Sequence, residues 1–150
     1  MTAKSWDAVW MSIADAMAQR SSCVRAQCGS VVIDPSNRII ATGYNGEPAD
    51  YPFNCAAGCP HATDSPHNIV GYVRCIAIHA EANALLFCDR RLREGGTIYV
   101  STTICIDCAK LIANSGVKYV MFRDDAPHRN GARSTDFMRD AGLDVYVWKD

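Results

Sequence analysis

The sequence predicts an α/β protein of three layers, an α-β-α sandwich in which helices cover both faces of a central, mixed five-stranded sheet. Helical and strand-like segments alternate along its 150 residues in the order α-β-β-α-β-α-β-α-β. The composition, 49% hydrophobic and 21% charged, is that of an ordinary globular domain and excludes a disordered or coiled-coil chain. The length suits one domain, so we expect residues 1–150 to fold as a single unit.

The first third of the chain predicts a helix followed by a hairpin. Apolar residues at helical spacing predict a helix over residues 6–17, with Ser5 as its N-cap. Strand-forming residues follow over residues 30–33 and 39–42. The segment between them, Asp-Pro-Ser-Asn at residues 34–37, has turn chemistry. We therefore expect these two strands to pair as an antiparallel hairpin.

Three helices and three strands alternate through the second half of the chain. Gly116 and Gly142 each follow a helical segment, where glycine is favoured as a C-cap. The predicted helices cover residues 79–88, 105–115 and 134–141, and the predicted strands cover residues 97–101, 117–122 and 143–148. Because strands joined through helices form right-handed crossovers, we expect them to pair in parallel.

The charge balance and the cysteine content narrow the class of function. Fifteen Lys and Arg against sixteen Asp and Glu give a net charge of −1, whereas a protein that holds a polynucleotide normally carries a basic surface. No apolar run reaches the ~18 residues that span a bilayer, and residues 1–10 lack the hydrophobic segment of a signal peptide. We therefore expect a cytoplasmic protein with no membrane partner, whose eight cysteines serve metal binding or catalysis.

Two short motifs at predicted helix starts indicate a catalytic zinc. Cys105 and Cys108 form a Cys-x-x-Cys on the first turn of a helix, where the helix dipole favours thiolates. His79 begins a neighbouring helix and offers a third ligand, which leaves the fourth tetrahedral position for water. Zinc lowers the pKa of such water towards ~7. Glu81 lies roughly 200° around the helix from His79, so we expect it to stay off the metal and to move protons beside it.

The same residues admit less specific explanations. A Cys-x-x-Cys alone is also typical of a redox dithiol, and a lone His-x-Glu occurs by chance. The two motifs together, in this order and separated by a predicted strand, form the signature of zinc-dependent nucleobase deaminases. We therefore favour a zinc site made by His79, Cys105 and Cys108.

Five segments of the chain resemble one enzyme superfamily. They are residues 28–34, 42–46, 79–85, 105–110 and 115–120. Through them most of the chain resembles the cytidine deaminase superfamily. The Gly-Tyr-Asn-Gly loop and the His-Ala-Glu-x-Asn-Ala segment narrow the resemblance to deoxycytidylate (dCMP) deaminases. The resemblance implies a cytidine-deaminase-like fold and an enzyme that deaminates a cytosine nucleotide.

The resemblance also implies a role for each residue of the zinc motifs. His79, Cys105 and Cys108 would hold the zinc, whose hydroxide attacks C4 of the pyrimidine. Glu81 would carry the proton of the water to ring N3 and then to the departing amine, which leaves as ammonia. The implied reaction is dCMP to dUMP, with 5-substituted dCMP and CMP as alternative substrates.

Substrate contacts are expected around the same motifs. Asn45 resembles the family's sugar- or base-contacting asparagine, and its alternative role is that of a turn residue beside Gly46. Tyr44 and Ala80 lie in the matching motifs and are further candidate contacts. Arg25 is a cation that could reach an anionic substrate, or a solvated surface charge.

Two positions depart from the family pattern. Ile104 stands before the Cys-x-x-Cys where the family usually has proline, which presets a helix start but supplies no ligand. We therefore expect little chemical effect. Residues 76–77 are Ile-Ala where many members carry Arg-Thr, and Arg74 is displaced from that position. If that arginine helps to hold a 5′-phosphate, phosphate recognition is altered in this chain.

The irregular stretch over residues 43–78 predicts a second, structural metal site. A loop this long in a compact domain is usually functional or held by a ligand, and four Cys or His side chains around a zinc would hold it. The resemblance to some dCMP deaminases implies that the ligands are Cys23, Cys55, Cys59 and Cys75, with His67 or His61 as the substitute for one cysteine. The alternative is buried free thiols, which we expect for Cys28 and Cys88.

Partners and rival functions complete the expectations. Because family members form dimers or hexamers and several are regulated by dCTP or dTTP, we expect a homo-oligomer, with such regulation acting through residues 43–46. One rival function is a deaminase of tRNA or single-stranded DNA, which needs a basic groove and stacking aromatics. The other is a catalytically inactive zinc-binding module, which would have no use for Glu81.

Overall fold

The computed structural model describes residues 3–61, 74–125 and 131–149. The helices are α1 (Trp6–Ala18), α2 (Cys55–Gly58), α3 (Ala80–Leu86), α4 (Arg90–Arg93), α5 (Ile106–Ala113) and α6 (Gly131–Asp140). The strands are β1 (Gly29–Ile33), β2 (Ile39–Tyr44), β3 (Thr97–Val100), β4 (Tyr119–Phe122) and β5 (Asp144–Val147). The predicted elements are therefore confirmed in type and order, and the short helices α2 and α4 are additions that the sequence did not predict.

The five strands form one mixed sheet in the order β2-β1-β3-β4-β5. The hairpin of β1 and β2 is antiparallel, as expected, and β3, β4 and β5 pair in parallel. The expectation of parallel pairing is wrong for β2 and β3, which are joined through α3. β1 lies between them and pairs antiparallel with β3, because the tight hairpin has already placed β1 beside β2.

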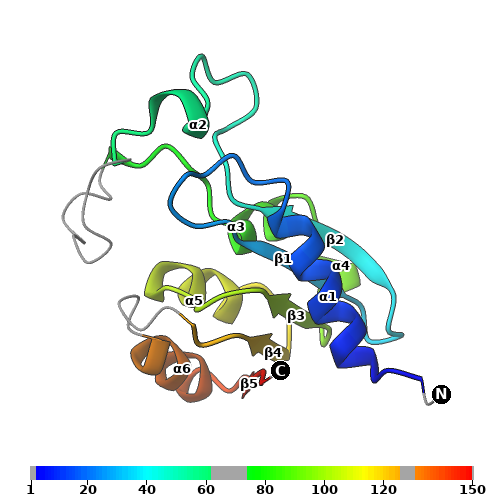
Figure 1. The fold of residues 1–150 in the computed structure, drawn as a ribbon. Helices are drawn as coiled ribbons and strands as arrows, with labels where there is room; N and C mark the ends of the chain where they lie inside the picture. The colour runs from blue at the N-terminus through cyan, green and yellow to red at the C-terminus, as the bar shows by residue number, and fades with distance from the viewer. Residues whose placement is uncertain (1–2, 62–73, 126–130, 150) are drawn as a thin grey trace.

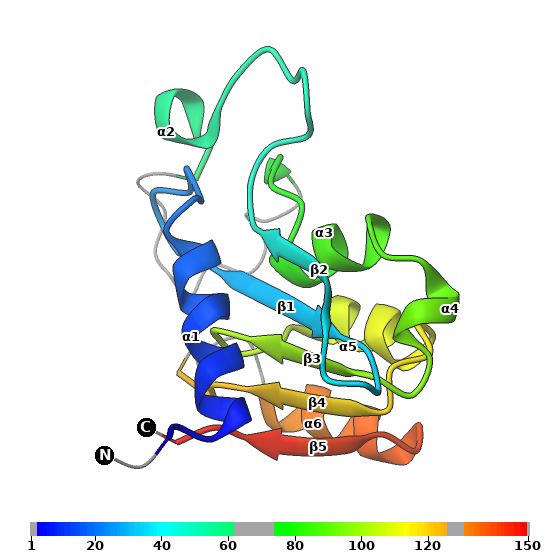
Figure 2. The same cartoon turned by 90° about the vertical axis from the view of Figure 1, so that its right-hand side faces the viewer.

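Helices cover both faces of this sheet, which confirms the α/β class with three layers (Figures 1 and 2). Helix α1 packs on one face through a core that includes Trp10, Met11 and Tyr99. Helices α3, α5 and α6 pack on the other face around a larger core that includes Ile98, Ile112 and Phe122. Strand β1 is buried along its whole length, between β2 and the central strand β3.

The helix ends follow from local chemistry. Ser5 caps α1, as predicted, by accepting the backbone N–H of Ala8. Gly116 and Gly142 follow α5 and α6 with positive φ angles of 99° and 88°, which glycine adopts readily. No helix in the described ranges has the length and apolar composition needed to cross a membrane.

Candidate active site and metal centre

The three predicted metal ligands meet at the N-termini of two neighbouring helices. His79 is the N-cap residue of α3, and Cys105 is the N-cap residue of α5. Cys108 lies in the first turn of α5, and its backbone N–H donates to Cys105 Sγ at 3.5 Å. His79 Nδ1 and the two sulfurs all lie within 4.8 Å of one another. Within the described parts of the chain, no other three side chains meet this geometric condition for a metal site.

The spacing of these atoms fits a tetrahedral zinc ion. Zn–S bonds of about 2.3 Å and a Zn–N bond of about 2.0–2.1 Å place nitrogen and sulfur about 3.5 Å apart across a tetrahedral edge. His79 Nδ1 lies 3.4 Å from Cys105 Sγ and 3.3 Å from Cys108 Sγ. Both sulfurs therefore face the imidazole, an arrangement that suits a shared metal better than a redox dithiol.

The hydrogen bond that the two buried thiols share shifts their pKa values in opposite directions. The hydrogen bond from Cys108 lowers the pKa of Cys105, and His79 contributes in the same direction against the effect of burial. The bond to Cys105, then burial and the nearby Glu81 carboxylate, raise the pKa of Cys108. Because two buried thiolates repel each other, the loss of both protons requires a cation between them.

Glu81 lies beside the metal ligands and is not part of the group that they form. It occupies the first turn of α3 and is only 2% exposed. Its carboxylate is close enough to the Cys108 thiol to help raise the pKa of that thiol. A buried carboxylate at this position can exchange protons with a group bound in the pocket, because it does not need to leave the metal to do so.

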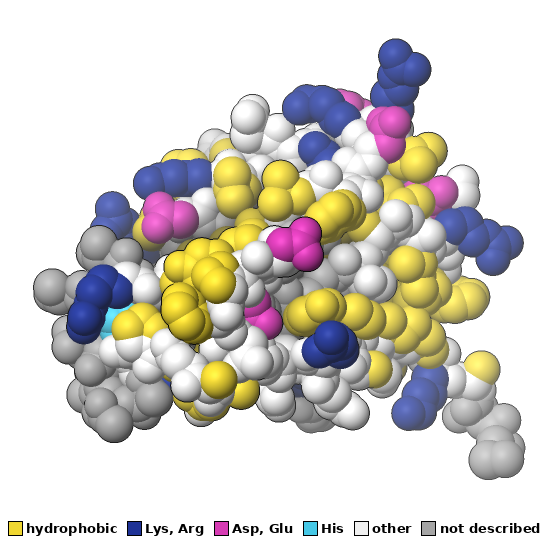
Figure 3. Space-filling model, turned by 90° about the horizontal axis from the view of Figure 1, so that it is seen from above, with side chains coloured by type: hydrophobic (Ala, Val, Ile, Leu, Met, Phe, Trp, Pro, Cys, Tyr) yellow, Lys and Arg dark blue, Asp and Glu magenta, His cyan; other side chains and the backbone are white. Residues whose placement is uncertain are grey.

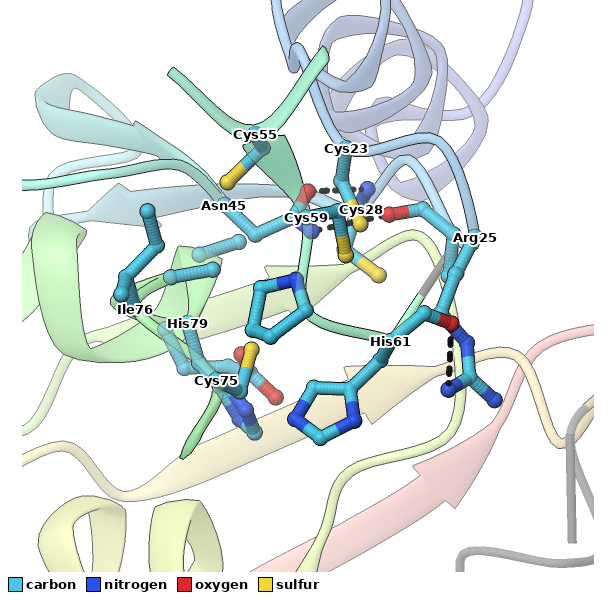
Figure 4. A pocket seen from close by; sticks show the side chains of 15 residues that line it. Cys23, Arg25, Cys28, Asn45, Cys55, Cys59, His61, Cys75, Ile76 and His79 are labelled. Atoms are coloured by element: carbon cyan, nitrogen blue, oxygen red, sulfur yellow. Dashed lines mark hydrogen bonds between the residues drawn. The ribbon is translucent and has the colours of Figure 1, made fainter. Parts of the chain in front are cut away.

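One pocket connects this group with the loops around α2 (Figure 4). Figure 4 shows Cys75 and His79 on one side of it and Cys23 and Cys55 on the opposite side. Its lining also includes Arg25, Ala26, Cys28, Asn45, Cys59, Pro60, His61, Ile76, Ala77, Ala80 and Glu81. The pocket therefore brings together three of the four predicted substrate contacts, Asn45, Arg25 and Ala80, with the candidate zinc ligand His79 and with Glu81.

Asn45 has a structural task that neither sequence-based alternative described. Its Oδ1 accepts the backbone N–H of Cys28 at 2.8 Å, and its Nδ2 donates to the carbonyl of Ala26 at 2.8 Å. The side chain thus clamps the segment before β1 while lining the pocket. A primary amide has two N–H donors, and the bond to Ala26 requires only one of them.

The pocket has an apolar wall at residues 76–77, where the sequence departs from the family pattern, and a cationic wall at Arg25. Ile76 and Ala77 line it, whereas Arg74 is exposed and is not among the lining residues. Arg25 lines it and donates from Nη1 to the carbonyl of His61 at 3.2 Å. Tyr44, the fourth predicted contact, is outside the lining, and its ring faces the guanidinium of Arg20 at 5.5 Å instead.

The cysteines expected to hold a second zinc share the pocket but do not form a closed metal site. Cys23, Cys55, Cys59 and Cys75 all line it, from four separate points along the chain. Burial, followed by Glu47 and the neighbouring Cys23 and Cys75, raises the pKa of Cys55 to about 11. No three of these sulfurs lie within 4.8 Å of one another. His61 is buried in the same pocket, and His67 lies outside the described residues.

Other features in and beside the pocket were not predicted from the sequence. Cys28 is buried, as expected of a core residue, and also lines the pocket. Glu47 accepts the hydroxyl of Ser22 at 2.9 Å and the backbone N–H of Cys55 at 3.0 Å, so it fixes the start of α2. The hydrogen bond from the Cys55 backbone is the main reason that the pKa of Glu47 falls to about 2. These contacts join segments that are distant in the sequence, so no local pattern predicts them.

The face above α2 does not form a continuous basic groove (Figure 3). Hydrophobic and acidic side chains lie at the middle of this face, and Lys and Arg side chains lie mostly towards its edge. A polynucleotide held by its phosphates would need cations along its path. This face therefore gives the polynucleotide alternative no support.

Removal of an amino group from a nucleobase by water requires a Lewis acid and a proton carrier within one pocket. At the N-termini of α3 and α5, His79, Cys105 and Cys108 would hold the metal ion that acts as the Lewis acid, and the neighbouring Glu81 would carry the protons. The fold and the site therefore define the class of zinc-dependent deaminases.

Comparison with known proteins gives the family. The family model described as "Cytidine and deoxycytidylate deaminase zinc-binding region" matches residues 4–123, and the chain belongs to this family. The chain is 42% identical over 133 residues to the deoxycytidylate deaminase of Mycobacterium phage D29, covering 81% of the chain and 97% of the relative. It is 33% identical over 142 residues to the Saccharomyces cerevisiae deoxycytidylate deaminase, covering 94% of the chain and 44% of that relative.

Solved structures share the fold. The dCMP deaminase of cyanophage S-TIM5, crystallised in complex with dCMP and dUMP, superposes with a TM-score of 0.75 and 25% identity. The match covers 99% of the chain and 100% of the cyanophage enzyme. The expected enzyme class, a zinc-dependent nucleotide deaminase, is confirmed by this family membership.

Proposed function

We propose that this chain hydrolyses dCMP to dUMP and ammonia. The observation that carries the proposal is the single pocket lined by His79, Glu81, Asn45 and Arg25. His79 is suited to metal binding and Glu81 to proton transfer. Asn45 and Arg25 are polar groups suited to contacts with a nucleotide. The names of the phage and yeast relatives, and the nucleotides bound by the cyanophage enzyme, support the same substrate.

The residues of the site divide the chemistry between them. Zinc held by His79, Cys105 and Cys108 supplies a Lewis acid that lowers the pKa of water to about 7. Glu81 would accept a proton from the attacking water and deliver it to N3 of the cytosine. It would then take the proton of the hydroxyl added at C4 and give it to the departing amine. Burial of Glu81 keeps bulk water from competing for that proton. The bond from C4 to the amine nitrogen breaks, and ammonia leaves.

The remaining polar residues are proposed to orient the nucleotide. The second N–H of Asn45 donates to the sugar or the base while the clamp on Ala26 and Cys28 holds the amide in place. The backbone of Ala80, between His79 and Glu81, borders the base. Arg25 faces the 5′-phosphate, since it is the guanidinium in a wall where Ile76 and Ala77 supply no charge.

The test is a panel of ammonia-release assays with cytosine, cytidine, deoxycytidine, CMP, dCMP and 5-substituted dCMP. We expect the highest kcat/KM with dCMP. Replacing Arg25 by alanine should lower kcat/KM for dCMP by about 10- to 100-fold and leave that for deoxycytidine almost unchanged, because only the nucleotide offers a phosphate to the guanidinium. Arg91→Ala, on the exposed surface of α4, is the matched control and should have no effect.

Two outcomes would contradict the proposed substrate. Turnover of an oligonucleotide or tRNA with none of mononucleotides would favour the polynucleotide alternative. Preference for a 5-substituted dCMP or for CMP would correct the base or sugar while keeping the reaction class. The same assays with dCTP and dTTP added test the regulation that the resemblance implies.

We also propose that Cys23, Cys55, Cys59 and Cys75 hold a second, structural zinc, with His61 or His67 as the substitute for one cysteine. The support is their common position around the pocket and the burial of Cys55. These thiols would have to approach one another and lose their protons when the ion binds. Such an ion would fasten α2 to the segment before α3.

Zinc counting tests this second site. Wild-type protein should carry two zinc ions per chain, and Cys55→Ser or Cys59→Ser should carry one, with lower thermal stability because the loop loses its cross-link. Cys88→Ala, which removes a buried thiol from the core on the other side of α3, should retain both ions. A single zinc in the wild-type protein would leave Cys55 and its neighbours as ordinary buried thiols.

Three further expectations stay predictions. They are assembly into dimers or hexamers, a cytoplasmic location and the single-domain organisation of residues 1–150. For assembly, the exposed Leu86 and Phe87 at the end of α3 provide an apolar surface at which copies could meet.

A further inference from the structure

The first turn of α3 is pressed against the backbone of β2. A Cβ atom on Gly43 would lie 2.1 Å from the carbonyl oxygen of Ala80 and 2.6 Å from the backbone nitrogen of Ala84. Only glycine permits this approach. β2 and α3 meet without an intervening side chain at this point. The backbone of β2 therefore limits where the start of α3, which carries Glu81, can lie.

Two side-chain hydrogen bonds fasten the same turn to two strands. The hydroxyl of Ser30, in β1, donates to the carbonyl of Ala80 at 2.8 Å, and both residues are fully buried. The amide of Asn83, one turn along α3, donates to the carbonyl of Tyr44 at the end of β2, also at 2.8 Å. The Ala80 carbonyl belongs to the peptide that joins Ala80 to Glu81, so the first bond sets the orientation of that peptide.

A backbone bridge fastens the chain just before the helix. Gly46 and Ile78 exchange two hydrogen bonds, of 3.1 Å and 2.8 Å. Residues 79–81 are therefore held on both sides, by the bridge before them and by Ser30 and Asn83 at the helix. The sheet is thus connected to the proton carrier by short, buried contacts.

We propose that Ser30 and Asn83 are positioning residues for the reaction, because they set the place of the Glu81 carboxylate relative to the His79, Cys105 and Cys108 group. This inference rests on the proposed function, in which Glu81 transfers the protons. Catalytic groups work within about 0.5 Å of their productive geometry. Loss of either bond frees the helix start to shift, and neither residue needs to touch the substrate.

Serine-to-alanine substitution provides a matched pair of variants. Ser30→Ala removes the bond to Ala80. Ser115→Ala removes a buried bond of 2.7 Å to the carbonyl of Ile112, at the far end of α5, and a longer one of 3.3 Å from the backbone N–H of Val117. Ser115→Ala should therefore lower the melting temperature at least as much as Ser30→Ala. Ser30→Ala should lower kcat by about 10- to 100-fold with KM changed by no more than about twofold, and its zinc content should not change. Ser115→Ala should retain wild-type kcat.

A second measurement works without any substrate. Amide hydrogen exchange over residues 80–86 should become about fivefold faster in Ser30→Ala and in Asn83→Ala, the factor expected for one lost hydrogen bond. In Ser115→Ala it should match the wild-type protein.

The failures of the two proposals can be told apart. Unchanged exchange over this helix in Ser30→Ala and Asn83→Ala overturns the positioning role, whether or not the chain deaminates dCMP. Equal kcat in Ser30→Ala and Ser115→Ala overturns it as well. If the wild-type protein deaminates nothing in the panel, the proposed function fails, and the exchange measurement still decides whether these bonds hold the helix start.

Discussion

Replacement of Glu81 by glutamine is expected to lower kcat for dCMP deamination by about 10²–10⁴-fold while the zinc content stays at the wild-type value. The amide has nearly the same shape as the carboxylate and so preserves the packing of a side chain that is 2% exposed. It cannot accept a proton from water and return it to the base. KM should change little, because the loss falls on proton transfer and not on nucleotide binding.

The measurement pairs steady-state kinetics with zinc analysis of the same preparation. Glu94→Gln is the control, since this carboxylate is largely exposed and pairs with Arg90 at the surface. It should retain wild-type kcat. If Glu81→Gln deaminated dCMP at the wild-type rate, the proton carrier would have to be another group, and the role proposed for Glu81 would be refuted.

Replacement of Cys108 by serine is expected to remove one zinc ion per chain and with it all measurable activity. Cys108 is buried, and its Sγ lies 3.3 Å from His79 Nδ1. No other described thiol forms such a group with His79 and Cys105, so none can take its place. A hydroxyl of normal pKa is a far poorer zinc ligand than a thiolate, since the ligand must lose its proton to bind. The stability should also fall, because the ion joins two helix starts.

Metal analysis and activity are again measured together, with Cys88→Ala as the matched cysteine control. Cys88 is also buried but is not part of the group of three candidate ligands, so its loss should retain both zinc and turnover. If Cys108→Ser fails to fold, a chelator applied to wild-type protein gives the same information: activity should disappear and return on addition of zinc. Full activity in Cys108→Ser with no zinc bound would refute the metal site.

Much of the fold was predictable because its elements carry strong local patterns. The periodicity of residues 6–17 and the turn chemistry at residues 34–37 gave α1 and the hairpin to within one or two residues. Helices α2 and α4, of four residues each, were missed because one turn is too short to show a period. The place of β1 between β2 and β3 was missed because strand order depends on contacts that no single segment encodes.

The residues of the site likewise include some that local patterns predict and others that they do not. The metal motifs were visible because His79, Cys105 and Cys108 lie at helix starts, where spacing alone fixes the geometry of a turn. The clamp made by Asn45 was not visible, because its partners lie 17 and 19 residues earlier in the chain. Tyr44 was expected at the substrate, but its ring is directed to Arg20. Sequence adjacency to Asn45 did not place it in the pocket.

The double duty of Asn45 has a consequence for anyone who redesigns this enzyme. One amide both holds the backbone before β1 and lines the pocket proposed for the nucleotide. A library that varies this position to change sugar preference will therefore lose variants through misfolding before recognition is ever sampled. Selectivity is better sought at Ile76 and Ala77, which line the same pocket and make no comparable side-chain hydrogen bond to the backbone.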